Sequence, residues 1–449
     1  MTKEYKLLFC LKILLIFFLF NGCSTKVQNP SIHENFSIED KISGITPKDI
    51  KIYPQNAHTY TKNIPKLKTP KQKLIQNFRK IYFLPWTMKS MQITQKQASW
   101  GNSYKNINMY GENYQKIKTI WFNTMIDKSN MDAFDTLGKK AITIKNSHLK
   151  VFPSLKPMFK NYQSAGEGFP FDYNQNTSIK INSPLYVSHY SKDKAWVYVT
   201  SSYSAGWISF LDIAFVDDTL ATKIRESDSL YITTKDKTPI YKNGLFKEYT
   251  SIGTVFPYRK NKLVSVIRDN NAKGYLSYID SNTNISPFPL PFNEKNVSSI
   301  INNMLGQKYG WGGLYNNRDC SLLTKDYFRV FGIEIERNSF GQTKSGTYIP
   351  ADTLSDKEKL QFIKQKAIPF LSLIYIKGHI GLYLGTYNDT PLMFHATWGI
   401  KTLDKEEKNG RIIVGKSIIS SLELGKEFDI YNDKNNYLRK MKGIVLFNN

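Results

Sequence analysis

Hydrophobic positions along the chain recur with two different periods. Between about 139 and 285, short runs of alternating hydrophobic and polar residues are separated by Gly, Asn and Asp, which predicts short strands. After Pro287 the spacing becomes helical, and Asn293 is a candidate N-cap. The hydrophobic residues with this spacing are Val297, Ile300, Ile301, Met304 and Leu305. The chain therefore combines β-rich modules with a C-terminal part that begins as a helix.

The C-terminal part contains a second predicted helix. A Gly-rich turn at 309–313 precedes it, and the helix is expected at 320–331. Asp319 is its expected N-cap, and Gly332 should end it in the left-handed conformation. Strands are expected downstream at 370–376, 379–384, 392–397 and 443–447. Helices followed by an antiparallel meander predict an α+β domain, which we place at 286–449.

Two stretches of the β-rich part resemble each other. Residues 142–152 echo 232–241, and 197–208 echo 264–276. Both copies show short alternating strands and a Gly-aromatic-aliphatic step, which is typical of small SH3-like barrels. The sequence therefore predicts two such β-barrels in tandem.

The first copy is longer than the second. With the barrels placed at 139–220 and 221–285, the first holds about 22 more residues between its landmarks. The surplus lies around 166–173, a long loop that is either functional or a flap that packs one domain against another.

The N-terminal part is less regular. Residues 23–70 are rich in Lys, Asn, Thr and Pro, and we expect them to form a tether. Residues 71–138 show helical pieces and should form a small helical domain. The aromatic residues expected to anchor its core are Trp86, Trp100, Tyr104, Tyr110, Tyr114 and Trp121.

The chain begins like an exported protein. Lys3 and Lys6 precede an apolar run at 13–20, which is too short for a membrane span and predicts a signal peptide at 1–22. Cys23 follows in a context that resembles a lipobox, so we expect it to carry lipid; plain secretion and an uncleaved anchor are the alternatives. Ser24 favours the outer membrane, so the protein is expected on the periplasmic face of a membrane.

Composition narrows the possible functions. The chain has 449 residues, 41% of them hydrophobic, enough for two to four domains. Its net charge of +25 points to nucleic acid, a membrane or an acidic wall polymer as partner, and the export signal argues against nucleic acid. Three cysteines exclude a disulfide scaffold and a Cys-rich zinc module. After export and lipidation, only the thiol of Cys320 remains free.

Cys320 lies where a reactive thiol would be expected. The start of a helix stabilises a thiolate and should lower the pKa of this thiol. Only two histidines follow it, His379 and His395, on consecutive predicted strands. If the hairpin loop between them has an odd number of residues, both point to the same face. One histidine could then take the thiol proton while the other orients it.

Three blocks of sequence resemble the NlpC/p60 family of papain-like cysteine peptidases. The blocks are Tyr309-Gly310-Trp311-Gly312-Gly313, Arg318-Asp319-Cys320-Ser321 and Gly378-His379-Ile380-Gly381-Leu382-Tyr383. Arg337-Asn338-Ser339 and Gln342 resemble a further stretch of the family. The tandem SH3-like modules resemble the branch with an N-terminal stabilising domain and two bacterial SH3 domains. The resemblance implies a multidomain α+β protein with a C-terminal papain-like catalytic domain.

The resemblance also implies roles for individual residues. Cys320 would be the nucleophile, His379 the base and His395 the residue that orients this base. Tyr309 would donate its hydroxyl to the oxyanion, together with the Cys320 amide. The resemblance implies no cofactor and no metal.

The family resemblance implies a substrate as well. Related enzymes cleave the stem peptides of peptidoglycan, or of muropeptides released from the wall, between γ-D-glutamate and the diamino acid. In the SH3-bearing branch a free N-terminal L-alanine is needed. Asp319 and Ser321 would bind its ammonium group, and Glu167 in the long loop is the best candidate for an added carboxylate.

The sequence leaves several other functions possible. Cys320, His379 and His395 could ligate zinc, although no short ligand pair is present. A wall-binding lipoprotein with an inactive peptidase domain would keep the SH3 modules. Among enzymes, an N-acetylmuramoyl-L-alanine amidase or a transpeptidase could use the same thiol.

Overall fold

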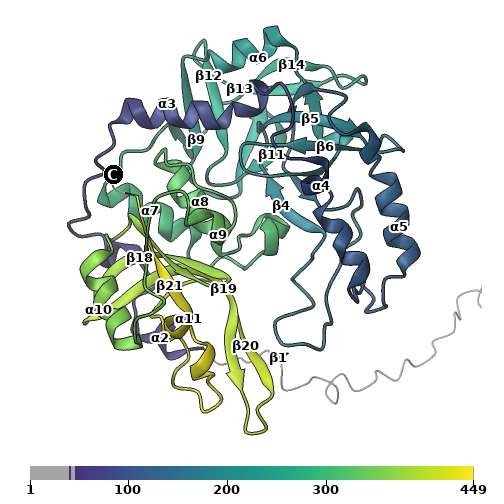
Figure 1. Cartoon of the computed structure of the whole chain (residues 1–449). Helices are drawn as coiled ribbons and strands as arrows, with labels where there is room; N and C mark the ends of the chain where they lie inside the picture. Colours follow the sequence, from purple (N-terminus) through teal and green to yellow (C-terminus); the bar gives the residue numbers. More distant parts are fainter. Residues whose placement is uncertain (1–39, 42–45, 448–449) are drawn as a thin grey trace, which may run out of the picture.

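The computed structural model describes residues 40–41 and 46–447 (Figure 1). The expected signal peptide and Cys23 lie outside these residues. Within the described part of the chain, no helix is long and apolar enough to cross a membrane.

The N-terminal region is helical, as expected. Its helices are α2 (Lys48–Ile52), α3 (Lys71–Tyr82), α4 (Gln95–Ala98) and α5 (Thr119–Lys128), with 3₁₀ turns at Ala57–Thr59, Leu84–Trp86, Trp100–Asn106 and Met131–Ala133. Trp86 is a core residue, and its Nε1 donates to the Ala141 carbonyl oxygen at 2.8 Å. The prediction was wrong for Trp100 and Tyr114, whose side chains are 48% and 59% exposed. Aromatic identity alone does not distinguish the buried face of short helical pieces from the exposed one.

Residues 46–70 differ from the expected tether, because they pack on the C-terminal domain. The Asp49 carboxylate accepts hydrogen bonds from the backbone amide and the hydroxyl of Ser421. Gln55 pairs with the backbone of Ile419 through both of its amide atoms. These contacts bury Asp49, so the segment is part of the folded body.

The first SH3-like module is an antiparallel sheet of seven strands. The strands are β2 (Lys139–Thr143), β3 (Ser147–Lys150), β4 (Gln175–Ile179), β5 (Pro184–Tyr190), β6 (Trp196–Thr200), β7 (Ala205–Ser209) and β8 (Ile213–Phe215). Their order in the sheet is β4-β3-β7-β6-β5-β2-β8. Alternate side chains such as Val187, Val197 and Ile208 face inward and form its core.

The second module follows helix α6 (Asp218–Arg225). Its strands are β9 (Ser229–Thr233), β10 (Thr238–Lys242), β11 (Leu245–Thr250), β12 (Val255–Arg259), β13 (Lys262–Arg268), β14 (Gly274–Ile279) and β15 (Ile285–Pro287). The two modules differ where the sequence predicted, because 24 residues separate β3 from β4 and only two separate β10 from β11. The extra residues include the loop 166–173.

The C-terminal domain has helices first and a meander afterwards, as predicted. Its helices are α7 (Glu294–Met304), α8 (Cys320–Val330), α9 (Ser339–Gln342), α10 (Asp356–Lys366) and α11 (Tyr437–Lys440), with 3₁₀ turns at Trp311–Asn316 and Asp433–Asn435. Its strands are β16 (Thr347–Pro350), β17 (Ser372–Ile376), β18 (His379–Tyr387), β19 (Thr390–Leu403), β20 (Asn409–Ser420) and β21 (Met441–Leu446). The sheet order is β1-β20-β19-β18-β17-β21-β16, in which β1 is Asp40–Lys41.

Helix α8 lies at the centre of the molecule, between the sheet of its own domain and the SH3-like modules (Figure 1). It packs against β18 and β19, and Leu323, Tyr327 and Phe328 are buried in the main core. Strands β19 and β20 continue beyond the sheet as a long hairpin arm (Figure 1). The sequence pattern did not predict β20.

Candidate active site

Cys320 is the first residue of α8. The Asp319 carboxylate caps the helix by accepting from the Leu322 amide at 2.8 Å, which confirms the predicted cap. The backbone amides of Ser321 and Ile380 donate to the Cys320 thiol, so the sulfur lies beside the start of β18. Cys320 and His379 line one cavity of about 270 Å³.

The two histidines form a hydrogen-bonded chain. His379 Nε2 and His395 Nδ1 are 2.8 Å apart, and His395 Nε2 is 2.9 Å from Ser420 Oγ. Ser420 donates its hydroxyl proton to the Ser421 carbonyl, which can only accept, so Ser420 Oγ must accept from His395 Nε2. Neutral His395 then accepts at Nδ1 from His379 Nε2. This direction leaves the lone pair of His379 Nδ1 free to take a proton.

A β-bulge brings the histidines to the same face. The hairpin loop between β18 and β19 has two residues, so the predicted condition of an odd loop is not met. A regular register would have placed the histidines on opposite faces. The bulge between Tyr383 and Gly385 shifts the register by one residue and puts His379 and His395 on one face.

Gly381 makes room for this arrangement. It lies between the histidines on the same face, and a Cβ built there would lie 2.9 Å from Met393 Sδ and 3.2 Å from His395 Cβ. A side chain at this position would therefore push His395 away from His379.

Sequence reasoning missed Tyr437. Its ring stacks on His379, with ring centroids 4.8 Å apart and an interplanar angle of 13°. Its hydroxyl lies 2.6 Å from Thr397 Oγ1, which fixes the ring. Tyr437 belongs to a helix of four residues far along the chain, where no periodicity marks it.

Burial sets the resting protonation of the thiol and its base. Burial, assisted by the Asp319 charge, raises the pKa of the Cys320 thiol to about 12. Burial also lowers the pKa of His379 to about 4. The expectation that the helix start lowers the thiol pKa is thus wrong, because desolvation outweighs the backbone amides. At neutral pH both groups are uncharged, and proton transfer has to accompany attack.

Tyr309 lies next to the thiol. Burial, followed by the proximity of Cys320, raises the pKa of Tyr309 well above its usual value, so its hydroxyl stays protonated and able to donate. Its ring contacts those of Trp398 and Phe171, with centroid distances of 5.9 and 6.3 Å. Phe171 comes from the long loop of the first SH3-like module, which therefore forms one wall of the cavity.

Asp319 and Ser321 lie together, and Arg337 engages both. The Arg337 guanidinium donates to the two Asp319 oxygens at 3.1 and 2.7 Å and to Ser321 Oγ at 2.9 Å. Its Nε donates to Thr177 Oγ1 in the first SH3-like module at 2.6 Å. Arg337 therefore links Asp319, the N-cap of α8, to the first SH3-like module.

The structure does not bring Glu167 to this pair. Its carboxylate accepts from the Tyr173 hydroxyl at 2.8 Å and lies 3.5 Å from Lys160 Nζ. The Tyr173 ring in turn contacts Trp311, which lines the cavity. Glu167 is thus separated from the cavity by aromatic rings, and its role as an ammonium ligand stays a prediction.

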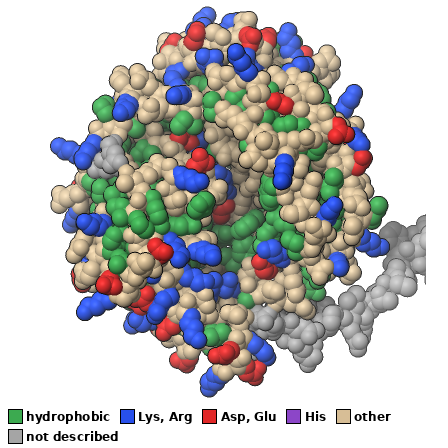
Figure 2. Space-filling view, in the orientation of Figure 1, with side chains coloured by type: hydrophobic (Ala, Val, Ile, Leu, Met, Phe, Trp, Pro, Cys, Tyr) green, Lys and Arg blue, Asp and Glu red, His purple; other side chains and the backbone are tan. Residues whose placement is uncertain are grey.

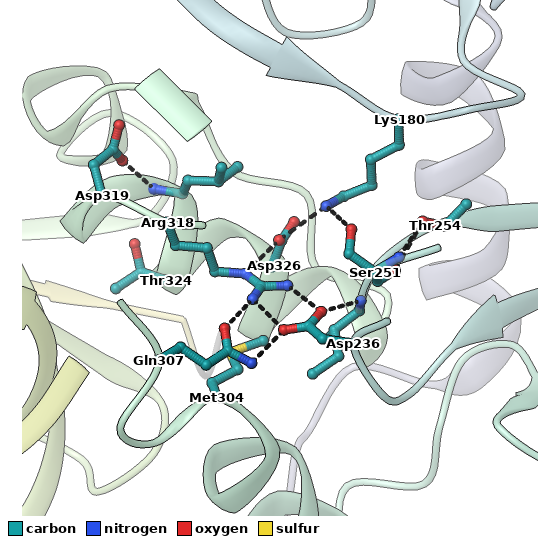
Figure 3. A network of polar contacts seen from close by, with 12 residues as sticks. Lys180, Asp236, Ser251, Thr254, Met304, Gln307, Arg318, Asp319, Thr324 and Asp326 are labelled. Carbon is teal, nitrogen blue, oxygen red and sulfur yellow. Dashed lines mark hydrogen bonds and ion pairs between the residues drawn. The ribbon is translucent and has the colours of Figure 1, made fainter. Parts of the chain in front are cut away.

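A polar junction of three domains fixes the segment before the nucleophile (Figure 3). Arg318 donates to both Asp236 oxygens at 2.6 and 2.8 Å and to Asp326 at 2.8 Å. Lys180 of the first module also reaches Asp326, at 3.0 Å. Although burial opposes ionisation, Arg318 lowers the pKa of Asp236 to about 2, so the ion pair persists at neutral pH.

The face drawn in Figure 2 is hollowed near its middle, with hydrophobic side chains in the hollow and Lys and Arg side chains below it. Among residues 46–447, no three His, Cys, Asp or Glu side chains are arranged to hold a metal ion. The hypothesis that Cys320, His379 and His395 bind zinc also conflicts with the hydrogen bond between the histidines.

A thiol at a helix start, a histidine with a free ring nitrogen and a buried partner for that histidine form a nucleophilic triad of the kind that cysteine peptidases use. Family models match three parts of the chain: the NLPC_P60 stabilising domain, N term, at 12–134, the SH3 domain (SH3b1 type) at 157–209 and the NlpC/P60 family at 306–416. The part of the chain that holds Cys320, His379 and His395 therefore matches the NlpC/P60 family of papain-like peptidases, a family of cell-wall peptidoglycan hydrolases.

One solved structure is similar over most of the chain. The chain is similar to an NlpC/P60 endopeptidase from Photobacterium damselae subsp. piscicida, with 25% identity and a TM-score of 0.80, covering 88% of this chain and 97% of that one. An NlpC/P60 family protein from Bacillus cereus ATCC 10987 is 16% identical with a TM-score of 0.40, covering 61% of this chain and 83% of that one. No curated protein sequence matches the chain.

The buried histidines should make stability depend on pH. Burial lowers the pKa of His379 and of His148 to about 4, and also lowers those of His189 and His395. The unfolded chain binds these protons below about pH 6.5, so this stability is complete above pH 6.5 and is lost towards pH 4. For His379 and His148 we expect a loss of about 2 kcal/mol each between pH 7 and pH 5.

Urea unfolding at pH 7, 6 and 5 measures this loss. Replacing the exposed His58 with Gln serves as the matched control and should leave the pH dependence unchanged. A free energy of unfolding that stays constant from pH 7 to pH 5 would contradict the burial of neutral histidines.

Proposed function

We propose that the protein is an exported cysteine endopeptidase that cleaves the γ-D-glutamyl–diamino acid bond of peptidoglycan stem peptides. The observation that carries this proposal is the hydrogen-bonded chain from Ser420 through His395 to His379 beside Cys320. We also propose that lipid on Cys23 holds the enzyme at the periplasmic face of a membrane, preferably the outer one.

The reaction follows from the protonation states. The Cys320 sulfur attacks the γ-carbonyl carbon while its proton moves to His379 Nδ1, and His395 stabilises the resulting imidazolium by accepting from its Nε2. The Tyr309 hydroxyl and the Cys320 amide would stabilise the oxyanion. His379 then protonates the leaving amine, and water hydrolyses the thioester with His379 again as base.

The proposal includes a free N-terminal L-alanine on the substrate. The loop 166–173 supports this, because Phe171 contacts Tyr309, Trp311 and Trp398 and narrows the cavity on that side. A glycan attached to the alanine would need the space that this loop fills. Asp319 and Ser321 would receive the ammonium group, with Arg337 holding them in place.

Soluble L-Ala-γ-D-Glu-diaminopimelate should therefore be cut after D-glutamate, and the N-acetylated peptide should be cut about 10⁴-fold more slowly. Acetylation removes the positive charge that Asp319 would attract, and it adds bulk on the side where the loop 166–173 narrows the cavity. Mass spectrometry of the digests, with rates from chromatography, gives both numbers. Similar rates for the two peptides would contradict the pocket, and cleavage of neither would favour an amidase.

Replacing Glu167 with Gln separates two roles for this residue. If Glu167 binds the ammonium group, the variant narrows the difference between free and acetylated peptide. If it only holds Tyr173, both rates fall by the same factor. Replacing the exposed Glu406, which pairs with Lys408 on the hairpin arm, is a control with the same change of charge.

A further inference from the structure

One wall of the catalytic cavity is cationic. The cavity that contains Cys320 and His379 is also lined by Lys377, Lys401, Arg411 and Lys440. None of the described residues that line it is an Asp or Glu. A cavity lined by several cationic side chains is suited to an anionic ligand.

Two of these cations approach each other. Lys401 and Lys440 line the same cavity, and burial together with this neighbouring lysine lowers the pKa of Lys401 to about 8. Arg411 adds to the same effect. Two ammonium groups placed side by side destabilise each other, so their position is not explained by folding stability.

The three cationic residues Lys401, Arg411 and Lys440 come from elements other than helix α8, which begins with Cys320. Lys401 and Arg411 lie on the hairpin arm of β19 and β20, and Lys440 ends α11. Arg411 also packs against Gly166 of the SH3 loop, where any Cβ would clash with its guanidinium. The arm, α11 and the SH3 loop therefore close around one end of the cavity.

We propose that Lys401 and Lys440, with Arg411, bind a substrate carboxylate beside the scissile bond. This inference rests on the proposed function and adds a subsite to it. Ammonium and guanidinium groups form charge-assisted hydrogen bonds with a carboxylate, and a bound carboxylate offsets the repulsion between the two lysines. Tyr437, which stacks on His379, begins the helix that Lys440 ends, so the subsite adjoins the reacting bond.

Three carboxylates of L-Ala-γ-D-Glu-diaminopimelate have this chemistry. One is the α-carboxylate of D-glutamate, and the other two belong to diaminopimelate. Peptides in which one of the three is converted to the amide separate these sources, since amidation removes the charge and keeps the shape.

The kinetic test compares wild type with the double variant Lys401→Met and Lys440→Met. For wild type, amidation of the bound carboxylate should lower kcat/KM about 10- to 100-fold. The double variant should cut the charged and amidated peptides at rates within about threefold of each other, without a lower Tm. Lys405→Met on the same arm is the matched control, because this exposed lysine does not line the cavity.

Two kinetic results would overturn the subsite. Wild type could cut all three singly amidated peptides as fast as the charged one, or the double variant could keep the full preference for charge. The amidated peptide that is cut slowly by wild type identifies which carboxylate is bound.

A second readout does not depend on peptidase activity. Cys320 is alkylated with anionic iodoacetate or neutral iodoacetamide, and its peptide is quantified by mass spectrometry. The cations should favour iodoacetate. The ratio of the alkylation rate with iodoacetate to that with iodoacetamide should therefore fall about 3- to 10-fold in the double variant and stay constant in Lys405→Met. If wild type cuts no peptide, the proposed function fails, but this ratio still tests the subsite. A ratio that is the same in wild type and the double variant overturns the subsite.

Discussion

Replacing Cys320 with Ala or Ser is expected to lower kcat/KM for the free stem peptide by at least about 10⁵-fold. The reaction needs a sulfur nucleophile, and a serine hydroxyl cannot replace it because His379 is a weak base with a pKa of about 4. The Tm should change little, since the thiol is small and Asp319 still caps α8. Peptide hydrolysis and thermal melting of the same preparations measure the two effects.

Iodoacetamide provides the control for this prediction. It should inactivate wild type in proportion to the alkylation of Cys320, which is the free cysteine of the described chain. Hydrolysis that persists in either variant, or in fully alkylated wild type, would end the assignment of Cys320 as nucleophile.

The two histidines should respond differently to substitution. His379→Ala removes the only base that the hydrogen-bond chain leaves free, and we expect a loss of about 10⁴- to 10⁵-fold in kcat/KM. His395→Asn or His395→Gln keeps an acceptor for His379 Nε2 and should retain measurable activity, with a loss of about 10- to 100-fold. His395→Ala lacks this acceptor and is the matched control.

Initial rates together with circular dichroism distinguish loss of function from loss of fold. Equal and complete inactivation of the folded His379→Ala and His395→Asn variants would show that acceptance of one hydrogen bond is not the role of His395. Full activity in His395→Ala would show that His379 needs no orienting partner.

Local signals in the sequence predicted the helices that build the site. Asn293 and Asp319 cap α7 and α8 as expected, because capping depends on one side chain and the next three amides. The position of the long SH3 loop was also predictable, since a repeat exposes an insertion by comparison with its other copy.

Other parts of the site depend on contacts that sequence patterns do not encode. The bulge at Leu384 inverts the parity of the hairpin, and the alternation of hydrophobic and polar residues does not give its position. Ser420 and Tyr437 reach the histidines through tertiary structure alone. The thiol pKa was predicted in the wrong direction because burial, which the sequence does not give, outweighs the helix start.

The ion pairs of Arg318 affect whether the C-terminal domain can be separated from the SH3-like modules. A chain that began at residue 286 would keep Arg318 and Asp326 but lose Asp236 and Lys180, which neutralise them here. Arg318, which directly precedes Asp319 and the catalytic Cys320, would then pair with one carboxylate instead of two. Separating the peptidase domain from the SH3-like modules would thus leave part of its buried charge without a partner, so selection is expected to keep the three domains together as one inherited unit.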